Sequence, residues 1–279
     1  MATVAPTARQ VAGLLDERRP VARALDYSSV TETPDDRITR EALAMLYTRY
    51  AFAASLAVGK DVLEVACGSG GGLGILARRA RRVVGGDVTE GLLRRARSHY
   101  NGRVPLLRLD AHALPFAAES FDVTILYEAI YYLASPEAYL EECRRVLRPG
   151  GLVLLCTVNR EWPDFNPSPF SVRYSSAAEL AGLLRRYGFQ PALYAAFPAE
   201  HRSVRDQIVS RLKRTAVRLH LVPRSMKGKV WLKRLFLGDL APAPPEVTEG
   251  MVAPEPLRSV EGDAPVRGYK VLYAIGRAG

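Results

Sequence analysis

Residues 61–74 read DVLEVACGSGGGLG, so a short apolar run leads directly into a glycine-rich turn. A helical pattern follows over 71–81. Glycines between a strand and a helix allow the backbone to approach a ligand closely. In open α/β sheets, ligands bind at the carboxyl ends of the strands. The stretch therefore predicts a ligand site at the end of this strand, and the alternative is a tight turn without a ligand.

The pattern around this stretch alternates between apolar runs and amphipathic segments, which indicates a doubly wound parallel sheet with helices on both faces. The predicted strands are DVLEVA (61–66), RVVGGD (82–87), PLLRLD (105–110), FDVTILY (121–127), GLVLLCTV (151–158), FQPALYAAF (189–197) and YKVLYAIGR (269–277). The predicted helices are 8–25, 38–57, 71–81, 90–100, 136–147 and 177–187.

Two acidic residues close successive predicted strands. Asp87 ends the second strand, 23 residues after Glu64, and Asp110 ends the third. A carboxylate at the first position suits the two hydroxyls of a ribose, and one at the second could meet an adenine amino group. Each acid alone could also be a helix cap, but two in register favour a nucleoside site.

Five motifs together resemble the class I S-adenosylmethionine-dependent methyltransferases, in their small-molecule branch. They are EVACGSGGG (64–72), VVGGD (83–87), LDAHALPF (109–116), FDVTILYEAIYYL (121–133) and LRPGGLVLL (147–155). The resemblance covers residues 40–198 and the final strand. It implies a Rossmann-like, seven-stranded sheet with an antiparallel last strand. One departure is Ala66, which stands where the family usually has the first glycine of its loop.

The resemblance also implies S-adenosylmethionine as cofactor, S-adenosylhomocysteine as product, and a role for each matching residue. Glu64 would order the loop and face the methionine amino group, Asp87 would hold the ribose and Val88 would pack on the adenine. The amino-acid part would be lined by Ala66, Cys67, Gly68, Ser69 and Gly70. The adenine edge would be read by Asp110 and Ala111. Tyr127 would lie beside the sulfonium, and by analogy Tyr50 would cover the donor.

Three residues are candidates for catalysis: Glu128, His112 and Tyr131. Glu128 is the best placed general base, and the alternatives are to orient the donor or to start a helix. His112 could act as a base because histidine titrates near neutral pH, or it could only line the pocket. Tyr131 could touch the acceptor or only pack. The loop 161–174 offers acceptor contacts through its aromatic and charged residues, or is a plain loop.

The formal net charge of +10 is concentrated in one segment. Residues 201–235 hold eleven Lys and Arg against one Asp, while the rest of the chain is neutral. About seventy residues separate the last two strands, too many for a hairpin. We therefore predict an N-terminal helical lid (1–57), a core (58–198), a basic and mostly helical cap insertion (199–265, with helices at 203–221 and 226–237) and a final core strand (266–279).

The basic cap has four possible roles: a solvated face, attraction of an anionic acceptor, peripheral contact with a membrane surface, or RNA binding. RNA is the least favoured, because no RNA-binding signature is present. No run reaches the ~20 apolar residues of a membrane span, and the N-terminus lacks a signal-like apolar core. The three cysteines are too scattered for a disulfide framework or a metal site. We expect no metal and a cytoplasmic, bacterial protein.

The sequence thus predicts methyl transfer to an oxygen or nitrogen of a small metabolite, in tailoring of secondary metabolites or sugars. A nicotinamide dinucleotide is disfavoured because Leu73 stands where its fingerprint needs a third glycine. Three alternatives stay open: a nucleic-acid methyltransferase, a non-methylating cyclase or pericyclase on the same fold, and a non-catalytic partner protein. The acceptor and the oligomeric state are not defined by the sequence.

Overall fold

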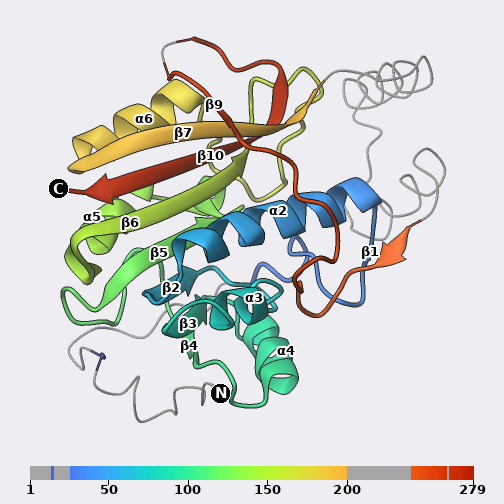
Figure 1. Cartoon of the computed structure of the whole chain (residues 1–279), viewed down its shortest axis with the longest axis vertical. Coiled ribbons are helices and arrows are strands. Elements are labelled where there is room, and N and C mark those ends of the chain that lie inside the picture. Colours follow the sequence, from blue (N-terminus) through green and yellow to red (C-terminus); the bar gives the residue numbers. More distant parts are fainter. Residues whose placement is uncertain (1–13, 16–25, 200–239, 263) are drawn as a thin grey trace.

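The computed structural model describes residues 14–15, 26–199, 240–262 and 264–279, and these form a mixed α/β fold (Figure 1). Over these residues the central sheet has eight strands in the order β4-β3-β2-β5-β6-β10-β7-β9. Their bounds are β2 Asp61–Val65, β3 Arg82–Asp87, β4 Leu106–Arg108, β5 Phe121–Tyr127, β6 Leu147–Val158, β7 Phe189–Pro198, β9 Arg258–Ser259 and β10 Tyr269–Ala278.

The strand directions confirm the predicted Rossmann-like sheet with an antiparallel last strand. Strands β4, β3, β2, β5 and β6 are parallel to one another, and β10 runs antiparallel to both β6 and β7. The predicted number of seven strands is wrong by one. Residues Arg258–Ser259 add an edge strand by pairing with Tyr194 and Ala195 of β7, and two residues are too short for a periodic signal in the sequence.

The helices divide between the two faces of the sheet. One face packs against α2 (Arg40–Leu56), α3 (Leu73–Ala77) and α4 (Glu90–Tyr100). The other packs against α5 (Pro136–Val146) and α6 (Ala177–Arg186). Side-chain caps set three of the starts: Thr39 for α2, Ser135 for α5 and a capping box of Ser176 with Glu179 for α6.

Helix α3 is shorter than the predicted span of 71–81. It begins after the glycines, with Gly72 as N-cap. It ends at Ala77 because the chain must turn back into β3, where the N–H groups of Arg81 and Arg82 both donate to the Lys60 carbonyl. The order of the strands reverses between β2 and β5, which places the ligand site of such a sheet at the carboxyl ends of these two strands.

Two segments outside the core pair with each other beside α2. Strand β1 (Arg37–Ile38) and strand β8 (Ala241–Pro242) form a small antiparallel ladder. From β8, residues 240–255, here called the strap, pass along α2, where Gly250 N–H donates to Tyr47 Oη and Glu255 N–H donates to Thr48 Oγ1, both at 2.9 Å. The strap belongs to the predicted insertion and contains no helix among its described residues.

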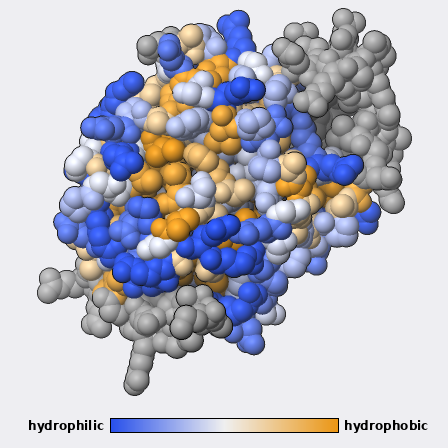
Figure 2. All heavy atoms as spheres, in the orientation of Figure 1, coloured by the Kyte–Doolittle hydropathy of each residue, from blue (hydrophilic) through white to orange (hydrophobic). Residues whose placement is uncertain are grey.

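The helices predicted at 203–221 and 226–237 lie outside the described residues. Of the helix predicted at 8–25, the structure describes only Leu14 and Leu15. The prediction is wrong at these two residues, because Leu15 forms an antiparallel bridge with Phe116 and the Leu14 carbonyl accepts from Ala117 N–H. Figure 2 shows hydrophobic residues gathered in the middle of one face between hydrophilic margins. No helix in the described part is long and apolar enough to cross a membrane.

Gly86→Ala tests the close packing of β3. A Cβ at Gly86 would lie 2.2 Å from Leu109 Cδ2 in a buried position. We expect a loss of about 1–3 kcal/mol in the free energy of unfolding, as for other overpacked cores. The matched control is Gly182→Ala inside α6, where a Cβ meets nothing within 4 Å. It should stabilise by up to about 1 kcal/mol. Urea unfolding measures both, and equal effects would contradict the packing argument.

Candidate active site

The glycine loop, residues 66–72, has a left-handed backbone at three positions. Gly68 and Gly70 have φ of +58° and +85°. Ala66 is also left-handed, at +57°, and for a residue with a Cβ this conformation costs about 1–2 kcal/mol. Ala66 therefore takes a conformation that glycine would adopt without this cost. The loop is tied to β3 by a hydrogen bond of 3.0 Å from Cys67 N–H to the Gly86 carbonyl.

Asp87 joins the glycine loop to the end of β3. One carboxylate oxygen accepts from Gly68 N–H at 2.9 Å and the other from Thr89 N–H at 2.7 Å. The side chain is buried, and burial raises the pKa of Asp87 in spite of these two bonds. Each oxygen keeps a further lone pair, so the carboxylate can still accept from two ribose hydroxyls.

Glu64 brings a second buried carboxylate to the same loop. Its Oε1 accepts a hydrogen bond from Tyr50 Oη of α2 at 2.5 Å. Its Oε2 is buried and has no hydrogen-bond partner among the described residues. Burial raises the pKa of Glu64 to about 8, which outweighs the bond from Tyr50 and the charge of Arg49. An unpaired buried carboxylate oxygen suits a cationic ligand group.

Asp110 and His112 form a pair at the next strand end. Asp110 Oδ1 accepts from His112 N–H at 2.9 Å and lies 2.6 Å from His112 Nδ1. The other ring nitrogen, Nε2, accepts from Ser135 N–H at 3.3 Å. Both ring nitrogens of His112 are thus occupied. This favours a role in lining the pocket over a role as general base. The second oxygen of Asp110 makes neither of these bonds and is the one that could meet an adenine.

Glu128 occupies a half-buried position in the same site, directly after β5. Its φ is +53°, a left-handed conformation that is rare for a non-glycine residue and typical of functional positions. Tyr131 Oη donates to Glu128 Oε2 at 3.1 Å, and Cys156 Sγ lies 3.6 Å from Oε1. The structure therefore brings two of the three predicted catalytic residues, Glu128 and Tyr131, into contact with each other.

Arg49 of α2 completes this group, although the sequence did not single it out as a site residue. Its terminal nitrogen lies 3.7 Å from Glu128 Oε1, and its Nε donates to the Met45 carbonyl at 3.2 Å. Burial lowers the pKa of Arg49, but the charges of Glu128, Cys156, Tyr50 and Tyr273 together raise it more, so the guanidinium stays charged. One feature of the sequence could have pointed to Arg49: it stands next to Tyr50, in the predicted helix that precedes the first core strand.

A row of side chains crosses the sheet below Arg49. Tyr127, Cys156 and Tyr273 lie opposite one another on β5, β6 and β10, and so face the same side, toward α2. The hydroxyls of Tyr127 and Tyr273 are buried, and within the described ranges neither has a hydrogen-bond partner. Two free hydroxyl donors beside a guanidinium suit a ligand group that accepts hydrogen bonds.

Aromatic rings gather beside Glu128 on the other side. Tyr131 stacks on Tyr174 with ring centroids 4.2 Å apart, and Tyr132 contacts both Tyr131 and Tyr27. Phe165 packs edge-on against Tyr174 at 4.7 Å. Thus Tyr174 of the loop 161–174 does reach the site region, whereas Arg173 of the same loop turns to Glu179.

The remaining cofactor candidates all lie at the same edge of the sheet. The Val88 carbonyl accepts from Arg108 Nε at 3.1 Å, and Ala111 follows Asp110 in a buried turn. Ser69 and Cys67 are buried within the loop. The segment that follows residue 25 crosses over this edge, because Tyr27 N–H donates to Thr89 Oγ1 at 3.1 Å and Thr31 packs on Gly68.

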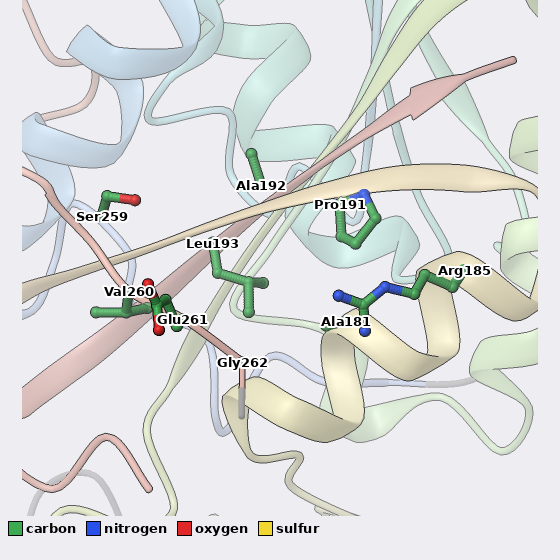
Figure 3. A pocket seen from close by; sticks show the side chains of 9 residues that line it. All are labelled: Ala181, Arg185, Pro191, Ala192, Leu193, Ser259, Val260, Glu261 and Gly262. Carbon is green, nitrogen blue, oxygen red and sulfur yellow. The ribbon is translucent and has the colours of Figure 1, made fainter. Parts of the chain in front are cut away.

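A surface hollow of about 290 Å³ lies elsewhere, at the β7 and β9 edge of the sheet (Figure 3). Its walls come from α6, β7 and residues 259–262, with Arg185 and Glu261 as the charged members. It contains none of the predicted site residues. Among the described residues, no group of three or more His, Cys, Asp or Glu is placed to hold a metal ion.

The fold and the carboxyl-edge site are similar to those of class I S-adenosylmethionine-dependent methyltransferases. The site fits the donor, since Glu64 offers a buried unpaired oxygen to its ammonium, Asp87 offers acceptors to its ribose and the left-handed loop gives backbone access. Residues 63–155 match the family described as methyltransferase domain.

Curated proteins of similar sequence are named as methyltransferases. The chain is 39% identical over 138 residues to a probable S-adenosylmethionine-dependent methyltransferase of Mycolicibacterium smegmatis, covering 47% of this chain and 52% of that protein. It is 35% identical over 140 residues to a ubiquinone biosynthesis O-methyltransferase of Dinoroseobacter shibae, covering 49% and 54%. The chain thus spans about half the length of the curated relatives it matches.

Two solved structures share the fold. A methyltransferase from Thermotoga maritima, named as a possible histamine N-methyltransferase, aligns with a TM-score of 0.55 at 18% identity, covering 86% of this chain and 94% of that one. The cyclase SpnF aligns with the same TM-score and identity over 99% and 97%. At this identity both show the fold alone.

Asp87→Ala should weaken binding of S-adenosylhomocysteine about tenfold to a hundredfold. The change removes charge-assisted hydrogen bonds worth about 1.5–3 kcal/mol. Isothermal titration measures the affinity, and thermal unfolding checks that the variant is folded. Asp35→Ala, which removes an exposed aspartate paired with Arg95, should bind as the wild type does. Wild-type affinity in folded Asp87→Ala would reject the ribose assignment.

The affinity for S-adenosylhomocysteine should rise as the pH increases from 6 to 7.5. The raised pKa of about 8 leaves Glu64 mostly protonated in the free protein, and the ligand ammonium favours the ionised form. The dissociation constant should therefore fall roughly tenfold per pH unit below 8. Titration at several pH values measures this slope.

Two controls isolate Glu64 in that experiment. Glu64→Gln should flatten the slope, because the amide does not titrate in this range. In the wild type, 5′-methylthioadenosine lacks the amino-acid ammonium, so its binding should depend little on pH. An equal slope for both ligands would show that Glu64 does not face the ammonium.

Proposed function

We propose that this protein transfers a methyl group from S-adenosylmethionine to an oxygen of a small, hydroxylated metabolite. The observation that carries the proposal is Glu128, a carboxylate in a left-handed conformation at the end of β5 that Arg49 and Tyr131 hold in place. Some relatives are named O-methyltransferases, which supports an oxygen rather than a nitrogen as the atom that receives the methyl group. We also propose that the protein acts in the cytoplasm.

The donor, when bound, supplies a methyl group on a positively charged sulfonium, which is already a good electrophile. The side chains of this chain would then supply binding and alignment, which account for much of the acceleration in such reactions. Asp87 would hold the ribose, Asp110 the adenine and Glu64 the ammonium. The loop 66–72 would fix the amino-acid part through its backbone.

Glu128 would act on the acceptor. Its carboxylate can accept a hydrogen bond from the acceptor hydroxyl and take the proton as the new carbon–oxygen bond forms. Tyr131 donates to Oε2 at 3.1 Å, and a carboxylate oxygen that accepts one hydrogen bond keeps a second lone pair for this task. Arg49 faces Oε1 with a positive charge and so fixes the orientation of the carboxylate. The rings of Tyr131, Tyr132 and Tyr174 would shield the reacting atoms from water.

The proposed acceptor carries a negative charge or a strongly accepting oxygen. Around Arg49, which pairs with Glu128, the buried hydroxyls of Tyr127 and Tyr273 have no hydrogen-bond partner among the described residues and can donate to a ligand. The net charge of +10 from residues 201–235 would attract such an acceptor by long-range steering. The same positive charge would also attract a nucleic acid, but the sequence disfavours that substrate because it has no RNA-binding signature.

The test is a methyltransferase assay with a panel of hydroxybenzoates, catechols and sugar acids, read by the formation of S-adenosylhomocysteine. Glu128→Gln should lower kcat about a hundredfold, as expected for loss of a positioned base. Its affinity for S-adenosylhomocysteine should stay within about twofold of the wild type, because Glu128 does not contact the loop.

Three outcomes would contradict this reading of the site. Product formed from an acceptor without S-adenosylhomocysteine would indicate a non-methylating enzyme on the same fold. Unchanged kcat in Glu128→Gln would remove the role of this residue as base. Methylation of RNA in preference to every small acceptor, with strong dependence on salt, would point to a nucleic-acid enzyme.

A further inference from the structure

Tyr100 of α4 lies directly beneath the glycine loop. Its side chain is fully buried, and its hydroxyl donates to the Gly70 carbonyl at 2.6 Å and accepts from Gly74 N–H at 2.9 Å. One hydroxyl therefore joins both ends of the turn between the loop and α3. Contact is so close that a Cβ on Gly70 would lie 2.8 Å from the tyrosine ring. The loop is therefore shaped by α4 as well as by its own glycines.

The strap reaches the same turn from outside the core. Val247 N–H donates to the Gly71 carbonyl at 2.8 Å. The neighbouring Glu246 carboxylate lies 3.0 Å from His99 Nε2, 3.3 Å from an Arg78 nitrogen and 3.5 Å from an Arg103 nitrogen. A Cβ on Gly74 would lie 2.5 Å from Glu246, so only glycine leaves room for this carboxylate.

Glu246 of the strap and Tyr100 of α4 thus both pack against the turn between the glycine loop and α3. His99, Tyr100 and Arg103 all belong to the end of α4 or the turn after it. The strap is itself held at its far end, where β8 pairs with β1 and Ala243 N–H donates to the Asp36 carbonyl. The segment that precedes β1 contains Thr31, which packs on Gly68. Segments far apart in sequence therefore meet on both sides of the glycine loop.

We propose that Glu246 and Tyr100 are positioning residues for the methyl donor, because they clamp the glycine loop in the conformation that binds it. Neither residue need touch the donor. A ligand that binds one conformation has an apparent dissociation constant equal to the intrinsic value divided by the fraction of protein in that conformation. If loss of the clamp reduces this fraction to about a tenth, donor affinity falls about tenfold.

The experiment uses the full chain and isothermal titration with S-adenosylhomocysteine. Glu246→Gln keeps the size of the side chain and removes its charge, and Tyr100→Phe keeps the ring and removes both loop hydrogen bonds. Each should raise the dissociation constant about tenfold. Hydrogen exchange should quicken at the amides of residues 68–74 in both variants, and saturating ligand should restore the protection.

Matched controls separate this role from a general effect on stability. Glu249→Gln removes another strap carboxylate, which pairs with Arg79 at 2.8 Å but is half exposed and does not contact the loop. Tyr139→Phe removes a buried hydroxyl on the opposite face of the sheet. Both should bind S-adenosylhomocysteine as the wild type does, even if their unfolding temperatures fall.

The possible results are distinct. Weaker binding and faster loop exchange in both test variants, but not in the controls, support the clamp. Wild-type affinity in folded Glu246→Gln and Tyr100→Phe overturns it, even with lower unfolding temperatures. If Glu246→Gln does not fold, Glu246→Asp and Tyr100→Phe decide the question. Failure of the wild type to bind would contradict the donor assignment itself, which is a separate result.

Discussion

The hydrogen bond from Gly68 N–H to the Asp87 carboxylate is the constraint on which the donor site depends. It ties the left-handed turn after β2 to the end of β3, and so fixes the loop against the strand that carries the ribose-binding acid. The same carboxylate also accepts from Thr89 N–H and thus sets the path from β3 toward α4. Helix α4 then returns Tyr100 to the loop at Gly70 and Gly74. Hydrogen bonds thus connect the glycine loop, Asp87 and α4 with one another.

Two buried carboxylates share this circuit, and burial raises the pKa of both Glu64 and Asp87. Ionisation of both is unfavourable in a protein without a ligand, because no cation among the described residues contacts either carboxylate directly. A donor that brings an ammonium and a sulfonium would relieve it. The free energy that the fold stores in unpaired groups such as Glu64 Oε2 is therefore available for binding.

The sequence predicted the sheet, the glycine loop and the acids because each depends on local pattern. Strand periodicity marks β2 to β7, and glycine and acid spacing marks residues 64–72, Asp87 and Asp110. Arg49, Tyr273 and the strap were not predicted as site features, because their roles arise from contacts across long separations, such as Val247 with Gly71. For His112 the sequence left open a role as base and a role in lining the pocket, and only the contact with Ser135 N–H shows that both ring nitrogens are occupied. The two-residue strand β9 carries no periodic signal at all.

Helix α2 links the donor half of the site to the acceptor half. Tyr50 reaches Glu64 beside the loop, while Arg49, one residue earlier, reaches Glu128 after β5. Tyr47 and Thr48 of the same helix hold the strap. A displacement of α2 would therefore alter the donor carboxylate, the acceptor carboxylate and the strap together. Because the helix is fixed to the sheet by buried contacts of Tyr47, Tyr50 and Ala53, the two halves of the site are held in register by one rigid element.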